Sequence, residues 1–325
     1  MRLPLLANLE AAAEVVYSAM SPTAQYRWPL LCARTGADVW VKHENHAPTG
    51  AFKVRGGLVY FEALSRRDRV PGVVAATRGN HGQSVGFAAA RYGIPAAIVV
   101  PHGNGVEKNH AMRALGVELI VAGDDFQASL EHAGDVARDR GWHKVPPFDP
   151  HLVAGVGTYA MEFLRAVSGL ETVYVPVGQG SGICGMIAAR DALGLRTKIV
   201  GVVSTGAPAY ALSFDAGRVV EHEVSTQLAD GLACRRPDAA ALDCIRNGVE
   251  RIVRVTDEEI ADAMRALYTD THNVAEGAGA AALAALLQES DRQRGRTVGV
   301  VISGGNVDAP LFGRILLEQV TSVPA

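Results

Sequence analysis

The sequence lacks several features that would assign it to common functional classes. Its formal net charge is −3, and it has no run of lysine and arginine interleaved with aromatic residues, so we expect no nucleic-acid-binding surface. No apolar run is long enough to span a membrane, and Glu10 and Glu14 interrupt the N-terminal region before a signal-peptide core develops. We therefore expect a cytoplasmic protein with neither nucleic acid nor a membrane as its partner.

Cysteine is also scarce, with four residues in the chain. Cys32, Cys184, Cys234 and Cys244 form no CxxC pair and no cluster with histidine at the spacing of zinc ligands. We expect free thiols in a reducing compartment, and the sequence predicts no metal site.

Apolar residues, by contrast, make up 48% of the chain, which is enough for one large core or two smaller ones. From about residue 72, short β-branched runs alternate with alanine-rich stretches, and this pattern predicts strands joined by crossover helices in mostly parallel sheets. The predicted strands are 72–77, 95–101, 117–123, 171–178, 197–204 and 296–303, and the predicted helices are 84–93, 107–116, 125–140 and 183–193. Thr256 and Glu259 form a capping-box pattern that predicts a further helix from about Asp257.

Lysine is scarce too, with five in the chain, and one of them lies in PTGAFKVRGG at residues 48–57. This residue, Lys53, lies between Phe52 and Val54. A lysine is ordinarily a solvated surface charge whose stem lies along apolar neighbours. An amine enclosed by apolar residues is instead poorly solvated, which lowers its pKa toward the range where it forms a Schiff base. The neighbouring residues alone leave both interpretations open.

Three of the predicted strands end in unusual turns, at the sheet edge where ligands of parallel sheets bind. GQGSG (178–182) offers backbone N–H groups to a phosphate, although a plain tight turn fits its glycines equally well. The polar side chains and backbone N–H groups of TRGNHGQS (77–84) suit the binding of a carboxylate. Alternatively, the turn is a polar helix cap to which Asn80 contributes, and His81 is a half-buried histidine with its hydrogen bonds satisfied. In SGGN (303–306), Ser303 either caps the strand or meets a ring nitrogen.

Together these four segments resemble the threonine and serine dehydratase family of fold type II pyridoxal phosphate (PLP) enzymes. PTGAFKVRG is similar to the family's PTGSFKxRG segment, TRGNHGQ to its SxGNHxQ turn, GQGSG to its tetraglycine loop and SGGN to its closing serine turn. The segments occur in the family's order and span residues 48–306. The resemblance implies an α/β fold with two three-layer α/β/α domains, mostly parallel sheets and PLP between the domains.

The resemblance also implies roles for individual residues. Lys53 would bind PLP covalently and act as the catalytic residue. The implied cofactor-binding residues are Phe52, Lys53, Asn80, Gly178, Gln179, Gly180, Ser181, Gly182, Glu276 and Ser303, with Ser303 facing the pyridine nitrogen. The implied substrate-binding residues are Thr77, Arg78, Gly79 and His81. Glu276 is alternatively an ordinary first-turn glutamate favoured by the helix dipole.

The sequence departs from the family pattern at Arg78, where many members carry a serine. In relatives that racemise serine this hydroxyl is the acid–base group, and because arginine is a poor proton shuttle we expect no racemase activity. Arg78 either pairs with a carboxylate of its own loop, which is the interpretation favoured here, or binds a second anionic group of the substrate. Asp230 in ADGLA (229–233) resembles part of a cation-binding loop, but an Asp-Gly pair is ordinarily only a turn, and no metal is predicted there.

The implied activity is that of a PLP-dependent lyase acting by β-elimination. Its substrate would be a β-hydroxy amino acid, such as threonine, serine, 3-hydroxyaspartate, phenylserine or a hydroxylated diamino acid, and its products a 2-oxo acid and ammonia. Two alternatives stay open: β-replacement, as in relatives of cysteine synthase, and a non-catalytic nucleotide-binding α/β protein, which leaves Lys53 unexplained.

The family's organisation implies a large PLP-binding domain from residues 1–71 and 149–325 and a small domain from residues 72–148. The proline- and glycine-rich stretch 144–158 is the predicted crossing between them. Since one helical stretch follows SGGN, we expect no regulatory domain, no feedback control by isoleucine and a catabolic role. Members of the family are commonly dimers, and we expect a homodimer.

Overall fold

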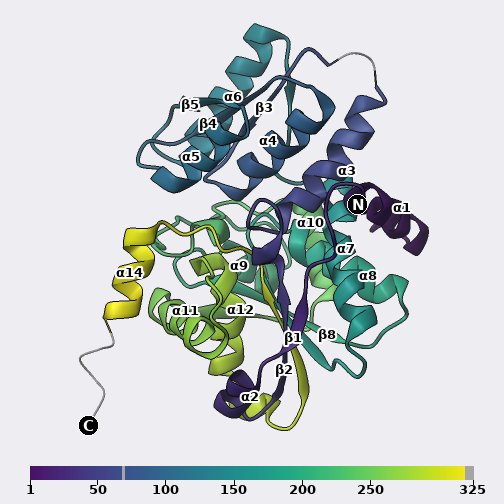
Figure 1. Ribbon diagram of the computed structural model, residues 1–325, viewed down its shortest axis with the longest axis vertical. Helices are drawn as coiled ribbons and strands as arrows, with labels where there is room; N and C mark the ends of the chain where they lie inside the picture. The colour runs from purple at the N-terminus through teal and green to yellow at the C-terminus, as the bar shows by residue number, and fades with distance from the viewer. Residues whose placement is uncertain (68–69, 319–325) are drawn as a thin grey trace.

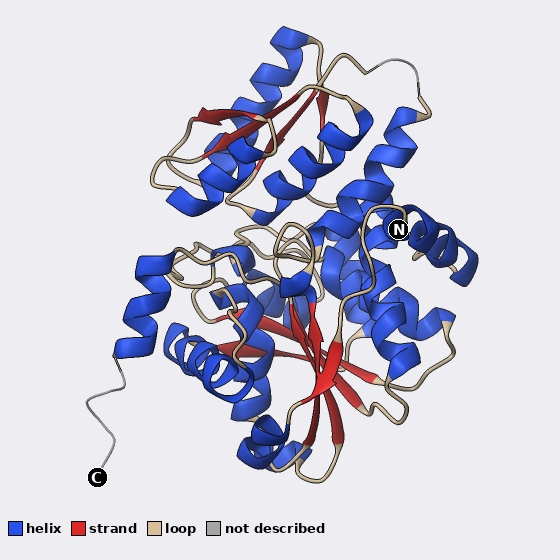
Figure 2. Ribbon diagram, in the orientation of Figure 1, coloured by secondary structure: helices blue, strands red, loops and turns tan. Residues whose placement is uncertain are grey.

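The computed structural model describes residues 1–67 and 70–318, so residues 68–69 and 319–325 of the predicted large domain lie outside the described part. The strands form two separate sheets, each with helices on both faces (Figure 1, Figure 2). No helix in the described ranges is long and apolar enough to cross a membrane. All four cysteines are free thiols, as predicted.

The larger sheet has six strands in the order β1-β2-β10-β7-β8-β9. β1 is antiparallel to β2, and all other neighbours are parallel. The strands are β1 (Gln25–Arg27), β2 (Asp38–His43), β7 (Thr172–Pro176), β8 (Lys198–Ser204), β9 (Arg251–Val255) and β10 (Thr297–Ile302). An N-terminal strand thus pairs with the last strand of the chain through β2 and β10.

Successive side chains of these strands point to opposite faces, and each face carries its own apolar core. On β7, Val173 and Val175 belong to one core and Tyr174 to the other. The first core includes residues of α1 (Leu6–Tyr17), α7 (Pro150–Ala166), α8 (Ser181–Ala192), α9 (Ala209–Ala216) and α10 (Ala239–Gly248). The second includes residues of α2 (Pro29–Thr35), α11 (Asp257–Thr271), α12 (Gly277–Gln288) and α14 (Ala309–Leu317). The short helices η1 (Glu44–His46), η2 (Asp230–Leu232) and α13 (Ser290–Gln293) lie in connections.

The smaller sheet has four parallel strands in the order β5-β4-β3-β6, and Figure 1 shows it above the larger sheet. They are β3 (Val73–Ala76), β4 (Ala96–Val100), β5 (Glu118–Val121) and β6 (His143–Lys144). One core joins this sheet to α3 (Lys53–Ser65), α4 (Asn80–Tyr92) and α5 (Val106–Ala114), and another joins it to α6 (Phe126–Arg140). The predicted α/β fold with mostly parallel sheets is confirmed.

Several predicted elements differ from the structure only at their ends. α11 begins at Asp257 as predicted, and both hydrogen bonds of the Thr256–Glu259 capping box are present. α4 begins at Asn80 and α8 at Ser181, earlier than predicted. In both cases the glycine-rich turn itself forms the start of the helix, whereas glycine's poor helix propensity favours a later start when the sequence is considered alone.

The predicted crossing segment 144–158 is helical from Pro150 onward, and its role as a domain crossing stays a prediction. The Asp149 carboxylate accepts a hydrogen bond from the His151 N–H, and Pro150 occupies the first helical position, where its missing N–H costs nothing. Gly155 inside α7 lies against α3, where a Cβ atom would overlap the carbonyl oxygen of Arg55. The glycines of this stretch therefore permit close packing of two helices. The domain boundaries at 71/72 and 148/149 stay a prediction.

The helix ends of α5 and α14 cap each other across the two sheets. The N–H of Val106 donates to Asp308 Oδ2 at 3.0 Å, and the N–H of Ala309 donates to Glu107 Oε1 at 3.0 Å. Both donors are at helix starts, where N–H groups have no partner within the helix. These reciprocal caps fasten the smaller sheet's α5 to a helix that packs on the larger sheet.

The three tryptophans are divided between the two sheets. Trp142 packs against the core on the α6 side of the smaller sheet, and the guanidinium carbon of Arg140 lies 5.0 Å from its ring centroid. Trp28 and Trp40 pack against the two cores of the larger sheet.

Candidate active site

One cavity is lined by residues of all four segments singled out in the sequence. Three turns border it at the carboxyl ends of their strands, after β3, β7 and β10, and Lys53 enters it from the start of α3. The predicted site residues that line it are Phe52, Lys53, Thr77, Arg78, Gly79, Asn80, His81, Gly178, Gln179, Gly180, Ser181, Gly182, Glu276 and Ser303.

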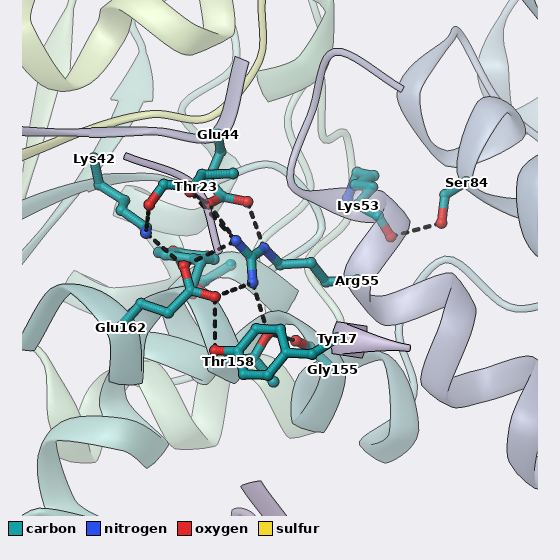
Figure 3. Close-up of polar contacts among 12 residues, drawn as sticks. Tyr17, Thr23, Lys42, Glu44, Lys53, Arg55, Ser84, Gly155, Thr158 and Glu162 are labelled. Carbon is teal, nitrogen blue, oxygen red and sulfur yellow. Dashed lines mark hydrogen bonds and ion pairs between the residues drawn. The ribbon is translucent and has the colours of Figure 1, made fainter. Parts of the chain in front are cut away.

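Lys53 is the first residue of α3, and its amine is poorly solvated. Burial lowers the pKa of the Lys53 amine to about 8, although the charge of Glu276 works in the opposite direction. Nζ lies 4.8 Å from the centroid of the Phe52 ring and makes no hydrogen bond or ion pair with any described residue. The backbone of Lys53 is fixed by Ser84, whose hydroxyl donates to the Lys53 carbonyl oxygen at 2.6 Å (Figure 3). At pH 7, one unit below this pKa, roughly a tenth of the amine is therefore neutral and nucleophilic.

The loop from Gly178 to Gly182 joins β7 to α8 as a cradle of backbone N–H groups. Gly180 has a φ of 95°, a conformation that suits glycine, and a Cβ atom there would lie 2.7 Å from that of Ala241. Tyr210 holds the loop by donating its hydroxyl to the Gln179 carbonyl at 3.2 Å. No described side chain caps α8, so its first N–H groups are free for an anion.

The turn from Thr77 to His81 joins β3 to α4 and also ends in an uncapped helix start. The N–H of Gly79 donates to Thr77 Oγ1 at 2.9 Å, which fixes the turn. The predicted alternative in which Asn80 caps the helix is wrong: Asn80 is the first helical residue, and its amide donates to Glu276. The first N–H groups of α4 are thus available to a carboxylate.

His81 is buried in this turn, and its Nε2 has no hydrogen-bond partner among the described residues. Burial lowers the pKa of His81 to about 3, and the charge of Lys53 adds to the effect, so the ring is neutral. A buried polar atom without a partner is unusual, and this one borders the cavity.

Ser303 follows β10 and connects the larger sheet to the lysine segment. Its hydroxyl is buried and donates weakly, at 3.4 Å, to the Ala278 carbonyl, while its own carbonyl accepts the N–H of Phe52 at 3.1 Å. Phe52 packs edge-on against Tyr159, with 6.0 Å between ring centroids. A neutral hydroxyl therefore borders the cavity beside the aromatic ring that precedes Lys53.

Lys108 is a cavity residue that the sequence reasoning missed. It belongs to α5, and its Nζ lies 2.6 Å from Asp230 Oδ2 and 3.5 Å from Glu276 Oε2. Burial opposes its charge, but the two carboxylates together outweigh burial and keep the pKa of Lys108 above its ordinary value. Burial raises the pKa of Glu276, and Lys108 counteracts this. No sequence motif links these residues, because more than a hundred residues separate α5 from η2.

Glu276 precedes α12 and lies fully inside this cluster, so it is not an ordinary surface glutamate of a first turn. Asn80 bridges it to Asn306, whose amide donates to Asn80 Oδ1 at 2.9 Å. Among residues 1–67 and 70–318, no group of three or more His, Cys, Asp or Glu is placed to bind a metal.

A second charged cluster lies behind Lys53, away from the cavity lining (Figure 3). Arg55 is fully buried between Glu44, at 2.7 Å from Nε, and Glu162, at 2.6 Å from Nη1, and also donates to Thr158. Lys42 donates to Glu162 from the other side. Burial would raise the pKa of Glu162, but Arg55 and Lys42 outweigh it and hold this pKa below its ordinary value. The cluster anchors α3 two residues after Lys53.

Arg78 has no such partners. Its Nε is buried without a hydrogen bond, and in the part of the chain that the structure describes no carboxylate lies within ion-pair distance of its guanidinium. The favoured interpretation from the sequence, a salt bridge within its own loop, is therefore wrong.

Comparison with known proteins identifies the chain's relatives. A family model for pyridoxal-phosphate dependent enzymes matches residues 16–304. L-threonine ammonia-lyase of Thermotoga maritima is 37% identical over 312 residues, which are 96% of this chain and 78% of that protein. The chain belongs to the threonine dehydratase family of PLP-dependent enzymes.

Solved structures agree with this family. The processed form of threonine deaminase isoform 2 from Solanum lycopersicum has a TM-score of 0.88 at 28% identity, over 95% of this chain and 86% of that one. Maize serine racemase has a TM-score of 0.90 at 27% identity, over 96% and 97%. The predicted PLP dependence, fold type II architecture and lyase chemistry are confirmed, and the alternative of a non-catalytic nucleotide-binding protein is wrong.

The residues of this member of the family fit PLP. The anion cradle of Gly178–Gly182 has no room for side chains at Gly178 and Gly180, and the amine of Lys53 is partly neutral. Ser303 offers a hydroxyl, and the partnerless His81 Nε2 borders the same cavity.

Proposed function

We propose that this enzyme removes water from a β-hydroxy amino acid of the threonine and serine type and releases a 2-oxo acid and ammonia. One observation carries the proposal: Lys53, the Gly178–Gly182 loop, the Thr77–His81 turn and Ser303 line a single cavity. The names of the relatives, threonine ammonia-lyase and threonine deaminase, support elimination rather than β-replacement.

We assign the cofactor-binding roles as the sequence implied them. Lys53 would bind PLP through Nζ, the N-terminus of α8 with the Gly178–Gly182 loop would bind its phosphate, and Ser303 would offer a hydroxyl to its ring nitrogen. When bound, PLP withdraws electron density from the substrate's Cα. Because the Ser303 hydroxyl is neutral, it holds no proton firmly on that nitrogen, which favours prompt loss of the β-substituent.

The residues assigned to substrate binding are those with hydrogen-bond donors that have no partner within the fold. The uncapped N–H groups of α4, at the Thr77–His81 turn, bind the substrate's α-carboxylate. Lys53 Nζ would accept the Cα proton, and its lowered pKa suits a base that works near neutral pH. The proton and the β-hydroxyl leave as water, and the resulting enamine is hydrolysed to the 2-oxo acid and ammonia.

The test uses purified holoenzyme and a panel of β-hydroxy amino acids, with the visible spectrum, 2-oxo acid and ammonia followed together. Wild type should show a band that shifts with substrate while both products appear in equal amounts. Lys53→Ala should lose turnover by roughly 10²–10⁴-fold or more. Lys198→Ala, at an exposed lysine paired with Glu250, is the matched control and should keep full activity. A Lys53→Ala enzyme with wild-type turnover would contradict the proposal.

We also propose that the enzyme is a cytoplasmic homodimer, as expected from the family resemblance. Light scattering of the eluting protein measures its mass directly, and a monomer at micromolar concentration would contradict this assignment.

A further inference from the structure

Apart from Lys53, to which PLP is assigned above, Arg78 is the exception among the buried or cavity-lining basic side chains described in this region. Lys42, Arg55 and Lys108 each contact at least one carboxylate. Arg78 lines the cavity with its Nε buried and unpaired, and none of its nitrogens has an ion-pair partner in the described ranges. Burying a polar atom of a charged group without a partner is costly. A residue kept in this state at a cavity wall is suited to a ligand that supplies the missing acceptor.

The carboxylates that line the cavity cannot serve as that acceptor. Asp230 and Glu276 both contact Lys108, and Glu276 also accepts the amide of Asn80. The anions already assigned to the site have donors of their own, because α8 and α4 both begin uncapped beside the cavity. An anion that pairs with Arg78 is therefore an additional one.

We propose, on the basis of the function proposed above, that the preferred substrate carries a second carboxylate and that Arg78 binds it. A guanidinium presents a planar fork of N–H donors that matches a carboxylate in two parallel hydrogen bonds. The substrate class is the β-hydroxy dicarboxylic amino acids, of which 3-hydroxyaspartate is the shortest. Arg78 thus acts as a specificity residue and takes no part in proton transfer.

The reaction balances as for the simpler substrates. The Cα proton and the β-hydroxyl leave as water, and hydrolysis of the enamine takes up water and releases ammonia. One 3-hydroxyaspartate gives one 2-oxo dicarboxylic acid and one ammonia, with no oxidant or reductant.

The first experiment compares kcat/KM for 3-hydroxyaspartate and threonine in the holoenzyme. Wild type should prefer 3-hydroxyaspartate, and Arg78→Met should lower the ratio of the two values by roughly 10- to 100-fold. Arg78→Lys should recover part of the ratio, because it keeps the charge but not the fork. Arg113→Met, at an exposed arginine of α5, is the control and should leave the ratio unchanged. If Arg78→Met lowers both values equally or leaves the ratio unchanged, Arg78 does not select a second carboxylate.

The second experiment does not depend on elimination. Aspartate and alanine lack a β-hydroxyl, and their binding to the holoenzyme is measured from the shift of the visible band. Aspartate should bind at least about tenfold more tightly than alanine in wild type, and the difference should disappear in Arg78→Met. Equal binding in wild type overturns the proposal even if threonine is turned over. A preference for aspartate that requires Arg78, in an enzyme that eliminates nothing, supports the Arg78 site and refutes the proposed function.

Discussion

Arg55, which lies behind the cavity, and Arg78, which lines it, are two arginines in opposite surroundings. Arg55 is fully enclosed by Glu44, Glu162 and Thr158, so its charge is neutralised within the fold. Arg78 borders the cavity with a buried Nε that has no hydrogen-bond partner among the described residues. A buried charge with all its partners present holds elements together, whereas one without partners is available to a ligand. Substitutions that separate these two conditions test the comparison.

The largest effect on stability is expected for Arg55→Met. The change leaves the buried carboxylates of Glu44 and Glu162 without their main partner, which should lower the free energy of unfolding by about 3–5 kcal/mol. Urea denaturation followed by far-UV circular dichroism measures the loss. Arg66→Met, which breaks an exposed pair with Glu62, is the control and should cost about 0–1 kcal/mol. Equal losses in the two variants would show that burial of the pair is unimportant.

The rate at which Lys53 reacts with PLP is expected to depend strongly on pH. Like Arg78, the Lys53 amine has no carboxylate within ion-pair distance among the described residues. Below a pKa of about 8 the amine is protonated and unreactive, and above it the amine is neutral. The rate of PLP uptake by cofactor-free protein should therefore level off above about pH 8 and exceed that of an ordinary lysine by roughly 300-fold at pH 7. Growth of the visible band measures the rate, with N-acetyl-lysine amide as the reference amine. A rate that still rises steeply at about pH 10 would refute the lowered pKa.

Lys108→Met should have an intermediate effect, because Lys108 is paired but borders the cavity. Its loss leaves the buried Glu276 side chain with Asn80 as its one remaining partner among the described residues, and we expect a destabilisation of about 1–3 kcal/mol. Calorimetry of the holoenzyme measures it, and Lys198→Met is the control at an exposed pair. A loss no larger than the control's would mean that the Lys108 cluster adds nothing to the fold.

The smallest effect on stability is expected for Arg78→Met, which removes no ion pair or hydrogen bond that the structure describes. The free energy of unfolding of the cofactor-free protein should change by less than about 0.5 kcal/mol. The same denaturation experiment as for Arg55 measures it, and a loss above about 1 kcal/mol would show that Arg78 supports the fold.

The fold was accessible from the sequence because its signals are local. The β-branched runs that became β3, β4, β7, β8 and β10 alternate with helical stretches, and Thr256 with Glu259 sets the start of α11 within four residues. The helix that starts at Pro150 was not predicted, because glycines that allow α7 to pack on α3 are also typical of turns.

Less of the candidate site than of the fold could be predicted from the sequence. The four motifs place Lys53, Asn80 and Ser303 correctly at one cavity because the carboxyl ends of parallel strands meet there. The position of Lys108 in the cavity, and the lack of a hydrogen-bond partner for Arg78 Nε, result from side chains that distant parts of the chain bring together. No local sequence pattern encodes such contacts. The buried state of Glu276 is hidden for the same reason: it comes from contacts with α5 and η2.

The distribution of the tryptophans makes the protein its own optical probe. Trp142 reports on the smaller sheet, while Trp28 and Trp40 report on the larger one. Bound PLP absorbs where tryptophan emits, so each indole transfers excitation energy to the cofactor with an efficiency set by their separation. The difference in emission between wild type and Trp142→Phe therefore isolates the smaller sheet, and its approach to the cofactor can be followed during turnover without an added dye.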